Sequence, residues 1–323
     1  MKKKVLISII IPIYNADKYL QVLLNSILMQ TFSNYEVLLI NDGSTDNSEE
    51  ICLDGMKKND KIKYFKKENT GVSATRNFGI EHAIGKYICF VDADDVLTNH
   101  YLSDLITTIE ENDSDMSCCN YIKFNSEIVE YDNDDSKLKI YTGINKYDLI
   151  YDRYGGYLWN KLFAKNIIIN NNIKFNSEIG MCEDMLFIFE YLKYTNKISC
   201  INNINYNYRI IENSASKDIH NLKWFSIFKT LDKIIESNNL YSSKTFNNVM
   251  YSYMYYLYEA KYRLKYNKGN KEYTRLKENI KNRFKNIKKQ NICFTHKQIL
   301  KLSIYKYFNT IAFKMKKRKE NRI

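Results

Sequence analysis

Residues 86–95 read KYICFVDADD, an apolar run that ends in three carboxylates, Asp92, Asp94 and Asp95. A short apolar run bounded by polar residues is typical of a strand buried on both faces. Like charges crowded at the tip of such a strand cost free energy unless a positive partner joins them. Two carboxylates one residue apart can hold a hard divalent cation. The same pair is also common in solvated turns, so this stretch alone leaves both interpretations open.

Three similar units precede this stretch. The apolar runs at 5–11, 36–40 and 61–66 predict strands, and the periodic segments 16–30, 45–58 and 73–85 predict helices between them. Thr45 or Asp46 is expected as the N-cap of the second helix, and Gly85 as the C-cap of the third. Strands that alternate with helices in this way predict an α/β fold with a mainly parallel sheet and helices on both faces.

Polar residues follow each of the four predicted strands. In a parallel sheet the carboxyl ends of the strands share one edge, and ligands bind there. Chance would scatter these residues over both edges, so their common position is the strongest physical signal in the chain. They are Pro12, Tyr14 and Asn15; Asn41, Asp42, Gly43 and Ser44; Glu68, Asn69 and Gly71; and Asp92, Asp94 and Asp95.

Two regions are expected beyond residue 112. Residues 113–215 contain further strand signals and one helix, and would complete a domain spanning 1–215. Residues 216–323 carry helical periodicity in four segments. The last 107 residues hold 26 Lys and Arg against seven Asp and Glu, whereas the preceding 216 residues are net acidic. Basic charge of this kind suits an anionic membrane or an anionic acceptor. The helices themselves could equally pack on their own domain or on a partner copy of the chain.

The N-terminus is expected to form the first core strand, because Pro12, Tyr14 and Asn15 interrupt its apolar run before a signal peptide would be complete. Seven scattered cysteines without a CxxC pair fit a reducing compartment. We therefore expect a cytoplasmic protein with possible peripheral contact at the inner face of the cell membrane. No nucleic-acid recognition motif is present, so nucleic acid is not expected as a partner.

Four motifs together resemble the family 2 glycosyltransferases, which have the GT-A fold. They are IPIYN (11–15), NDGSTD (41–46), ENTGVSATRN (68–77) and FVDADD (90–95), in this order and at this spacing. Downstream, WNKLF (159–163), CEDMLF (182–187) and YNYRIIENSAS (206–216) match further features of the bacterial capsule, exopolysaccharide and teichoic-acid members. The resemblance covers roughly residues 5–215. It implies an inverting transfer of a sugar from a nucleotide-diphosphate sugar, most often a UDP-sugar, to a hydroxyl of a glycan or lipid-linked acceptor.

The resemblance also implies roles for individual residues. Asp94 would be the principal ligand of Mn²⁺ or Mg²⁺, with Asp92 near the metal and the ribose. Asp184 would be the general base, a role that the neighbouring Glu183 could share or take over. The nucleotide base would be held by Pro12, Tyr14, Asp42, Asn69 and Arg76, the diphosphate by Arg209 and Ser214, and the acceptor and sugar side would be shaped by Trp159 and Lys161.

Each role has a simpler structural alternative. Asp184 would equally suit the first turn of a helix, where the helix dipole stabilises an acid. A non-catalytic nucleotide-sugar or glycan-binding module of the same fold is the main alternative function. A nucleotidyltransferase shares the sheet and the metal chemistry, but it usually carries a Gly-rich basic loop after the first strand, and residues 11–20 have none.

Overall fold

A computed structural model describes residues 5–125, 137–211, 218–268, 272–287, 292 and 294–307. The chain forms two compact units. The first comprises Met1–Glu178 and Cys182–Ile210, and the second comprises Ile179–Met181 and Ile211–Ile323.

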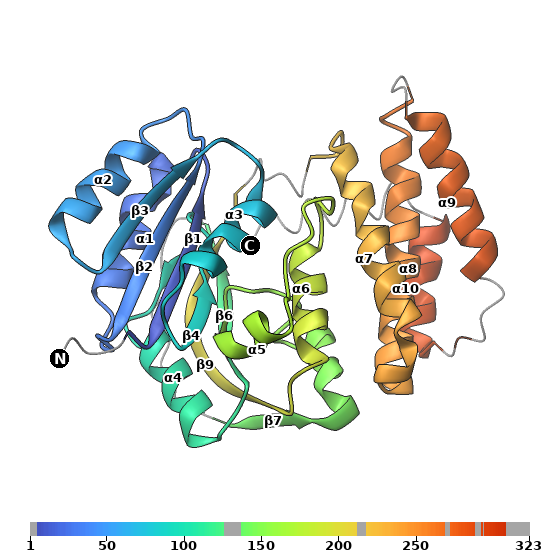
Figure 1. Ribbon diagram of the computed structural model, residues 1–323. Helices are drawn as coiled ribbons and strands as arrows, with labels where there is room; N and C mark the ends of the chain where they lie inside the picture. The colour runs from blue at the N-terminus through green and yellow to red at the C-terminus, as the bar shows by residue number, and fades with distance from the viewer. Residues whose placement is uncertain are drawn as a thin grey trace. The chain divides into compact units, whose positions relative to one another are not determined.

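The first unit is built on a sheet whose strands run in the order β3-β2-β1-β4-β8-β6-β9-β5 (Figure 1). The first four strands are all parallel, as their alternation with helices predicts. β8 is antiparallel to both neighbours, β6 and β9 are parallel to each other, and β5 and β7 pair antiparallel with β9. The α/β prediction is therefore confirmed. The strands are β1 (Ile7–Ile13), β2 (Tyr35–Asp42), β3 (Ile62–Lys67), β4 (Tyr87–Phe90), β5 (Val96–Leu97), β6 (Met116–Phe124), β7 (Lys139–Thr142), β8 (Lys161–Ala164) and β9 (Lys197–Arg209).

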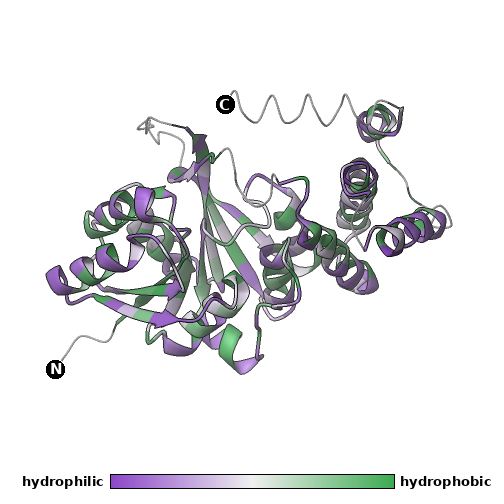
Figure 2. Ribbon diagram, turned by 90° about the horizontal axis from the view of Figure 1, so that it is seen from above, coloured by the Kyte–Doolittle hydropathy of each residue, from purple (hydrophilic) through white to green (hydrophobic). Residues whose placement is uncertain are grey.

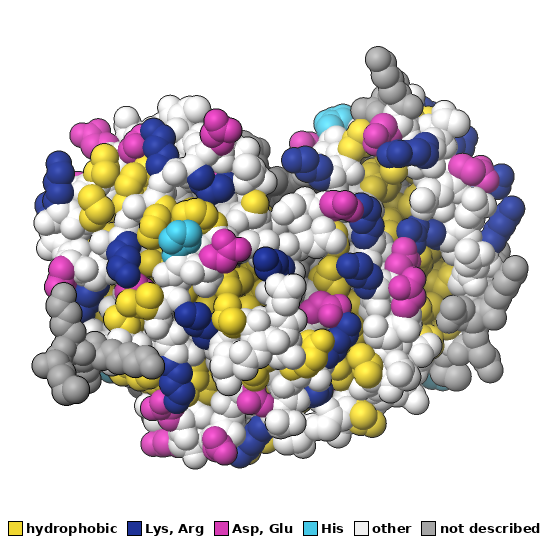
Figure 3. Space-filling view, in the orientation of Figure 1, with side chains coloured by type: hydrophobic (Ala, Val, Ile, Leu, Met, Phe, Trp, Pro, Cys, Tyr) yellow, Lys and Arg dark blue, Asp and Glu magenta, His cyan; other side chains and the backbone are white. Residues whose placement is uncertain are grey.

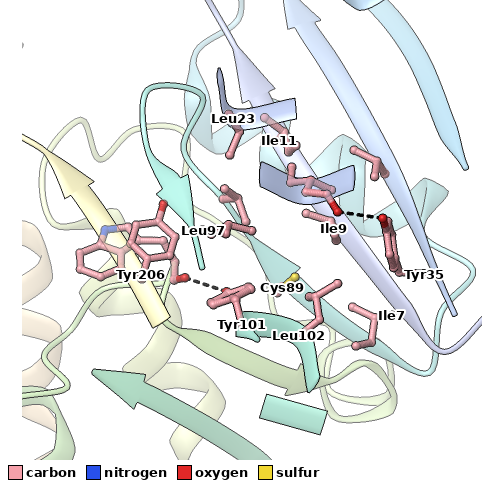
Figure 4. Packing of buried hydrophobic residues seen from close by; sticks show 14 of the residues in the cluster. Ile7, Ile9, Ile11, Leu23, Tyr35, Cys89, Leu97, Tyr101, Leu102 and Tyr206 are labelled. Atoms are coloured by element: carbon pink, nitrogen blue, oxygen red, sulfur yellow. Dashed lines mark hydrogen bonds between the residues drawn. The ribbon is translucent and has the colours of Figure 1, made fainter. Parts of the chain in front are cut away.

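Helices cover both faces of this sheet, because β1 is apolar on both sides. Ile7, Ile9 and Ile11 point to one face and pack with Leu23 of α1 and Leu102 of α4 (Figure 4). The other face carries α3, which packs on β1 and β2, and α6, which packs through Phe187 on Phe90 of β4. In Figure 2 the strands in the middle of the sheet are mostly green, as expected for a doubly covered sheet. The helices are α1 (Asp17–Leu28), α2 (Ser48–Lys58), α3 (Val72–His82), α4 (Tyr101–Glu111), α5 (Lys165–Asn170) and α6 (Glu183–Leu192), with a 3₁₀ segment at Gly143–Tyr151.

Two helix ends differ from the sequence-based expectation. α2 begins at Ser48 with Asn47 as its N-cap, because the carboxylate of Asp46 accepts hydrogen bonds from the amides of both Ser48 and Asp17 and so ties α2 to α1. α3 ends at His82, before Gly85. A Cβ atom at Gly85 would lie 2.7 Å from the amide nitrogen of Ser8. Gly85 is therefore needed for close contact with β1 and does not cap the helix.

Gly79 in α3 sets how closely this helix approaches the sheet. A Cβ atom there would lie 2.8 Å from Cδ1 of Ile40 and closer still to Ile10. We expect Gly79→Ala to lower the free energy of unfolding by about 1–3 kcal/mol, the usual cost of overpacking a core. Gly55→Ala in α2 is the matched control, because its Cβ would meet only ordinary contacts at 3.4 Å and alanine favours a helix. Urea unfolding measures both; equal stability of the two variants would contradict this account of α3.

The second unit is helical in its described residues. A 3₁₀ turn (Leu222–Ser226) leads into α7 (Ile227–Glu236), and a second (Asn238–Leu240) leads into α8 (Ser243–Leu264), which contacts α7, α9 (Tyr273–Ile287) and α10 (His296–Tyr307). Tyr258 of α8 packs on Phe284 of α9, and Tyr255 packs on Tyr305 of α10. An ion pair between Arg283 and Asp232, 2.6 Å apart, joins α9 to α7. None of the helices in the described ranges is long and apolar enough to span a bilayer.

Candidate active site

The polar residues that follow β1 to β4 meet at one edge of the sheet, as their positions predict. The backbone amide of Asn15 donates to the Ser44 hydroxyl at 3.1 Å, and the Thr45 amide donates to the Asn15 side chain at 2.8 Å. These bonds join the loop after β1 to the loop after β2. Because Asn15 has a positive φ of 51°, its backbone turns sharply at the end of β1 and leaves the side chain of Tyr14 54% exposed at this edge.

Asp42 organises the next pair of loops. Its carboxylate accepts hydrogen bonds from the amides of Thr70 and Gly71, both at 2.9 Å, and it is ion-paired with Lys67. Asp42 therefore fixes the loop that carries Asn69, whose side chain is exposed. Lys67 was not predicted from the sequence as a site residue. Its position at the end of β3, directly before Glu68 and Asn69, could have indicated it.

Arg76 joins two groups of acids that lie far apart in the sequence. Its Nη2 lies 3.2 Å from Asp92 in the DADD stretch, and its Nη1 lies 3.0 Å from Glu183 and 2.5 Å from Asp184. The side chain is buried and packs over the ring of Phe175. α3 holds Arg76 in its second turn, and α6 presents both acids in its first turn. One guanidinium thus connects the sheet edge to the start of α6.

Burial and charge oppose each other in this cluster. Burial alone would lower the pKa of Arg76, but Asp184, Asp92 and Glu183 raise it above its ordinary value, so the guanidinium is positively charged. Burial raises the pKa of Asp184 well above its ordinary value, Arg76 opposes that rise, and Glu183 and Asp92 add to it. Asp184 is therefore a carboxylate with an unusually strong tendency to accept a proton.

The N-terminus of α6 lies next to a strained residue. Cys182 precedes the two acids and has a left-handed backbone, with φ at 60° and ψ at 27°. Non-glycine residues in this region cost free energy and concentrate at functional sites. The expectation that Asp184 lies in the first turn of a helix is confirmed.

The three acids of DADD have different surroundings. Asp92 pairs with Arg76. Asp95 is buried and accepts hydrogen bonds from the Tyr206 hydroxyl at 2.6 Å and from the Arg209 amide at 2.7 Å, so it ties β9 to this edge. For Asp94, burial first and the charge of Asp92 second raise the pKa to about 6, while its own backbone amide and Arg209 lower it. Asp94 is thus a poorly compensated acid at neutral pH.

Arg209 lies beside Asp94 at the end of β9. Its Nε donates to the backbone carbonyl of Asp94 at 2.7 Å, and its guanidinium stacks over the rings of Phe124 and Tyr19. The structure therefore brings this predicted diphosphate ligand next to the predicted metal ligand. Ser214, predicted to act with it, lies outside the described residues.

An aromatic cluster supports the same edge. Trp159 is buried and stacks on Tyr206 at 4.5 Å between ring centroids and on Tyr157 at 4.9 Å. Trp159 therefore packs against Tyr206, whose hydroxyl contacts Asp95. Tyr157, which is 40% exposed, presents the open side of the cluster.

Lys161 lies inside the protein and not on its surface. Its side chain is fully buried, and its Nζ donates to the backbone carbonyls of Tyr154 and Tyr157, both at 2.8 Å, and of Gly155 at 3.0 Å. A lysine saturated in this way can contact neither sugar nor acceptor. The resemblance implies that Lys161 shapes the acceptor and sugar side, and the structure shows that it closes the turn before β8 from inside the protein.

The donor atoms at the DADD stretch fit a divalent cation in part. Within the described ranges, no group of three or more His, Cys, Asp or Glu side chains is placed to hold a metal ion. Asp92 and Asp94 supply hard oxygen ligands, and Mg²⁺-type sites commonly combine one or two carboxylates with substrate phosphates and water. The raised pKa of Asp94 shows that this position disfavours an uncompensated negative charge. The residues therefore fit a cation that enters together with a diphosphate.

The arrangement combines two chemical capacities. Tyr14 and Asn69 are exposed at a polar sheet edge that also carries the DADD acids and Arg209. Arg76 joins Asp184 and Glu183 to this edge. Such a site can bind a nucleotide diphosphate and place a strong carboxylate base beside it. Pro12, which is half-buried in β1, lies on the same edge.

Known proteins with similar sequences are glycosyltransferases. Residues 8–178 match the family described as glycosyl transferase family 2. Glycosyltransferase GlyA of Streptococcus pneumoniae is 33% identical over 68% of this chain and 32% of its own length. Putative glycosyltransferase EpsH of Bacillus subtilis is 29% identical over 63% of this chain and 60% of its own length. The chain thus spans about a third of the first relative and 60% of the second.

Solved structures share the fold. One is TarS of S. aureus, residues 1–349, in complex with UDP-GlcNAc, which is 25% identical to this chain. The two structures superpose with a TM-score of 0.61 over 71% of this chain and 66% of the TarS chain. The mannosyltransferase PcManGT from Pyrobaculum calidifontis is 12% identical and shares the fold at a TM-score of 0.58 over 98% of this chain and 88% of its own. With the family match extending over residues 8–178 and the motif residues gathered at one sheet edge, the chain belongs to glycosyl transferase family 2.

Proposed function

We propose that this protein is an inverting glycosyltransferase that moves a sugar from a UDP-sugar to a hydroxyl of a cell-surface glycan or lipid-linked acceptor. The observation that carries this proposal is the Arg76 cluster. The side chain of Arg76 contacts both Asp92 of the DADD stretch and the acids Asp184 and Glu183. A nucleotide-diphosphate site alone would need no second pair of acids. The UDP-GlcNAc bound by TarS, a protein of the same fold with 25% identity, supports UDP as the nucleotide.

Asp184 acts in this proposal as the general base. Its Oδ atom takes the proton of the acceptor hydroxyl while the hydroxyl oxygen attacks the anomeric carbon, and the diphosphate leaves from the opposite side. A single displacement of this kind inverts the anomeric centre. The raised pKa of Asp184 favours proton uptake, and Glu183 is the alternative base, since both acids contact the same Nη1 of Arg76.

Arg76 is assigned to these acids in place of the nucleotide base. Both terminal nitrogens of its buried guanidinium already pair with carboxylates. An arginine so placed keeps Asp184 oriented and limits how far burial raises its pKa. We therefore propose that Arg76 positions the base, and that Pro12, Tyr14, Asp42 and Asn69 hold the uracil, with Tyr14 stacking on it.

The diphosphate half of the site consists of DADD and Arg209. Asp94 and Asp92 would hold Mn²⁺ or Mg²⁺, which when bound offsets the charge that develops on the leaving diphosphate. Arg209 supplies a fixed positive charge to the same group, and Ser214 is proposed to assist it. Electrostatic stabilisation of the leaving group by such residues is commonly a large part of catalysis.

The acceptor is proposed to be a glycan or a lipid-linked sugar. The proposal retains the expected cytoplasmic location with peripheral contact at the membrane, where lipid-linked acceptors are found. Association into an oligomer is compatible with it.

The direct test is a screen of UDP-sugars with the purified protein and Mn²⁺ or Mg²⁺, in which the release of UDP is measured. We expect slow, metal-dependent UDP release from at least one sugar, because water can replace the acceptor. Donor binding without release, with or without candidate acceptors, would instead favour a non-catalytic nucleotide-sugar-binding module.

The pH dependence of metal-supported UDP binding is a separate prediction. Only the ionised carboxylate of Asp94 binds a cation, and its pKa is about 6. We expect the gain in UDP affinity from Mn²⁺ to be constant above pH 7 and to fall by about tenfold per unit below pH 6. Calorimetric titrations at several pH values measure it. A gain that persists undiminished at pH 5 would contradict a metal-binding Asp94 that titrates in this range.

A further inference from the structure

We propose that α10 docks the helical unit onto an anionic lipid surface through an apolar stripe made of Leu300, Ile304 and Tyr307. These three residues recur at i, i+4 and i+7 and therefore lie on one side of the helix. The stripe defines the surface for the peripheral contact proposed above. Its test needs no donor sugar, so its failure is distinguishable from failure of the proposed reaction.

Among the described residues of its unit, the stripe is largely exposed. The side chains of Leu300, Ile304 and Tyr307 are 65%, 45% and 69% exposed. Leu302, by contrast, is buried, and the ring of Tyr305 packs on Tyr255 of α8 with 5.0 Å between centroids. α10 is thus apolar on two sides, and packing on α8 accounts for one of them.

Exposed apolar side chains of the helical unit concentrate on this helix. Among its described residues, four of the five large hydrophobic side chains counted as exposed lie on α10, namely Ile299, Leu300, Ile304 and Tyr307, and the fifth is Tyr266. Single exposed apolar residues need no explanation, but a contiguous group marks an interaction surface. The group therefore indicates a partner with an apolar component.

The charge around the stripe selects an anionic partner. Lys297, Lys301 and Lys306 of α10 are all exposed. In the sequence, residues 279–319 hold 13 Lys and Arg and no Asp or Glu. On the visible face of the helical unit, Figure 3 shows Lys and Arg side chains interspersed with some Asp and Glu. Apolar side chains bordered by lysines match a membrane interface, where the lysines reach the phosphates and the apolar side chains enter the acyl boundary.

The same charges disfavour a second copy of the chain as the occupant. Two such stripes in contact would bring their lysine borders together, and like charges across an interface are repulsive. A phosphate polymer would satisfy the lysines but would leave the apolar stripe in water. An anionic bilayer satisfies both features.

Sedimentation with lipid vesicles tests this inference on the full chain. The vesicles are made of phosphatidylcholine alone or of an equal mixture with phosphatidylglycerol. The test variant carries Leu300→Ser, Ile304→Ser and Tyr307→Ser. The matched control carries Ile84→Ser and Ile144→Ser, which replace residues of the first unit that are 54% and 56% exposed.

We expect the wild type and the control to bind the anionic vesicles and the stripe variant to bind at least about tenfold more weakly, because membrane affinity scales with buried apolar area. Binding to phosphatidylcholine should be weak, and added salt should reduce binding to the anionic vesicles. All three proteins should keep the same melting temperature and the same affinity for UDP.

Three results would overturn the inference. The first is a wild type that does not bind anionic vesicles, and the second is a stripe variant that binds them as well as the control. The third is a dimer in sedimentation velocity that the stripe variant abolishes, which would assign the stripe to a second copy of the chain.

Discussion

Replacement of Asp184 by Asn is expected to lower kcat for sugar transfer by about 10²–10⁴-fold, the range usual for loss of a general base. Asn keeps the size of the side chain and can still contact Arg76, but it cannot take the proton of the acceptor hydroxyl. The affinity for UDP should change little, because neither the loops proposed to hold the uracil nor the DADD acids and Arg209 proposed to hold the diphosphate include Asp184. Initial rates of transfer and UDP titrations measure the two effects.

Two companion variants make this result specific. Glu190→Gln, in the same helix, removes an acid that is ion-paired with Lys193 and lies more than one turn from the cluster, and it should retain wild-type kcat. Glu183→Gln separates the two candidate bases, because the true base gives the larger loss. Full turnover in both Asp184→Asn and Glu183→Gln would show that the base lies elsewhere.

Replacement of Arg76 by Met is expected to lower the free energy of unfolding by about 3–5 kcal/mol at pH 8, because it leaves a cluster of partly buried carboxylates without their common partner. The loss should be smaller at pH 5. The acids can then take up protons, and the raised pKa of Asp184 makes it the first to do so. Denaturant unfolding at the two pH values measures the difference.

The same variant tests the positioning role of Arg76. Where Arg76→Met is still folded, its kcat should fall and the pH at which transfer becomes half-maximal should rise, because Arg76 no longer favours the ionised form of Asp184. Lys58→Met is the matched control, since it removes the exposed partner of Asp54 in the same unit and should change stability by less than about 1 kcal/mol. An Arg76→Met protein with wild-type stability and an unshifted pH profile would remove Arg76 from this account.

Much of the fold of the first unit could be predicted from the sequence. The periodicity of its hydrophobic residues and the order of its strands and helices along the chain determine that fold. The continuous apolar run of β1 can only be buried on both faces, and the β-α alternation then places four loops at one edge. The same alternation predicts that Asp42 and the DADD acids share that edge, because each follows a parallel strand.

The partners of these residues could not be predicted, because they come from contacts between distant segments. Nothing local marks Arg76 as the partner of Asp184, 108 positions away. Tyr206 contacts Asp95 only because β9 returns beside β5. The burial of Lys161 has the same origin, since it depends on a turn folding back over its Nζ.

The central claim is that the DADD edge binds a sugar nucleotide's diphosphate together with a divalent cation, and calorimetric titration with UDP at pH 7.5 tests it most directly. The account predicts that wild-type protein binds UDP clearly more tightly with Mn²⁺ than with EDTA, and that Asp94→Ala removes this difference while the melting temperature is retained. Equal affinity for UDP with and without Mn²⁺, or an unchanged metal effect in Asp94→Ala, would contradict it.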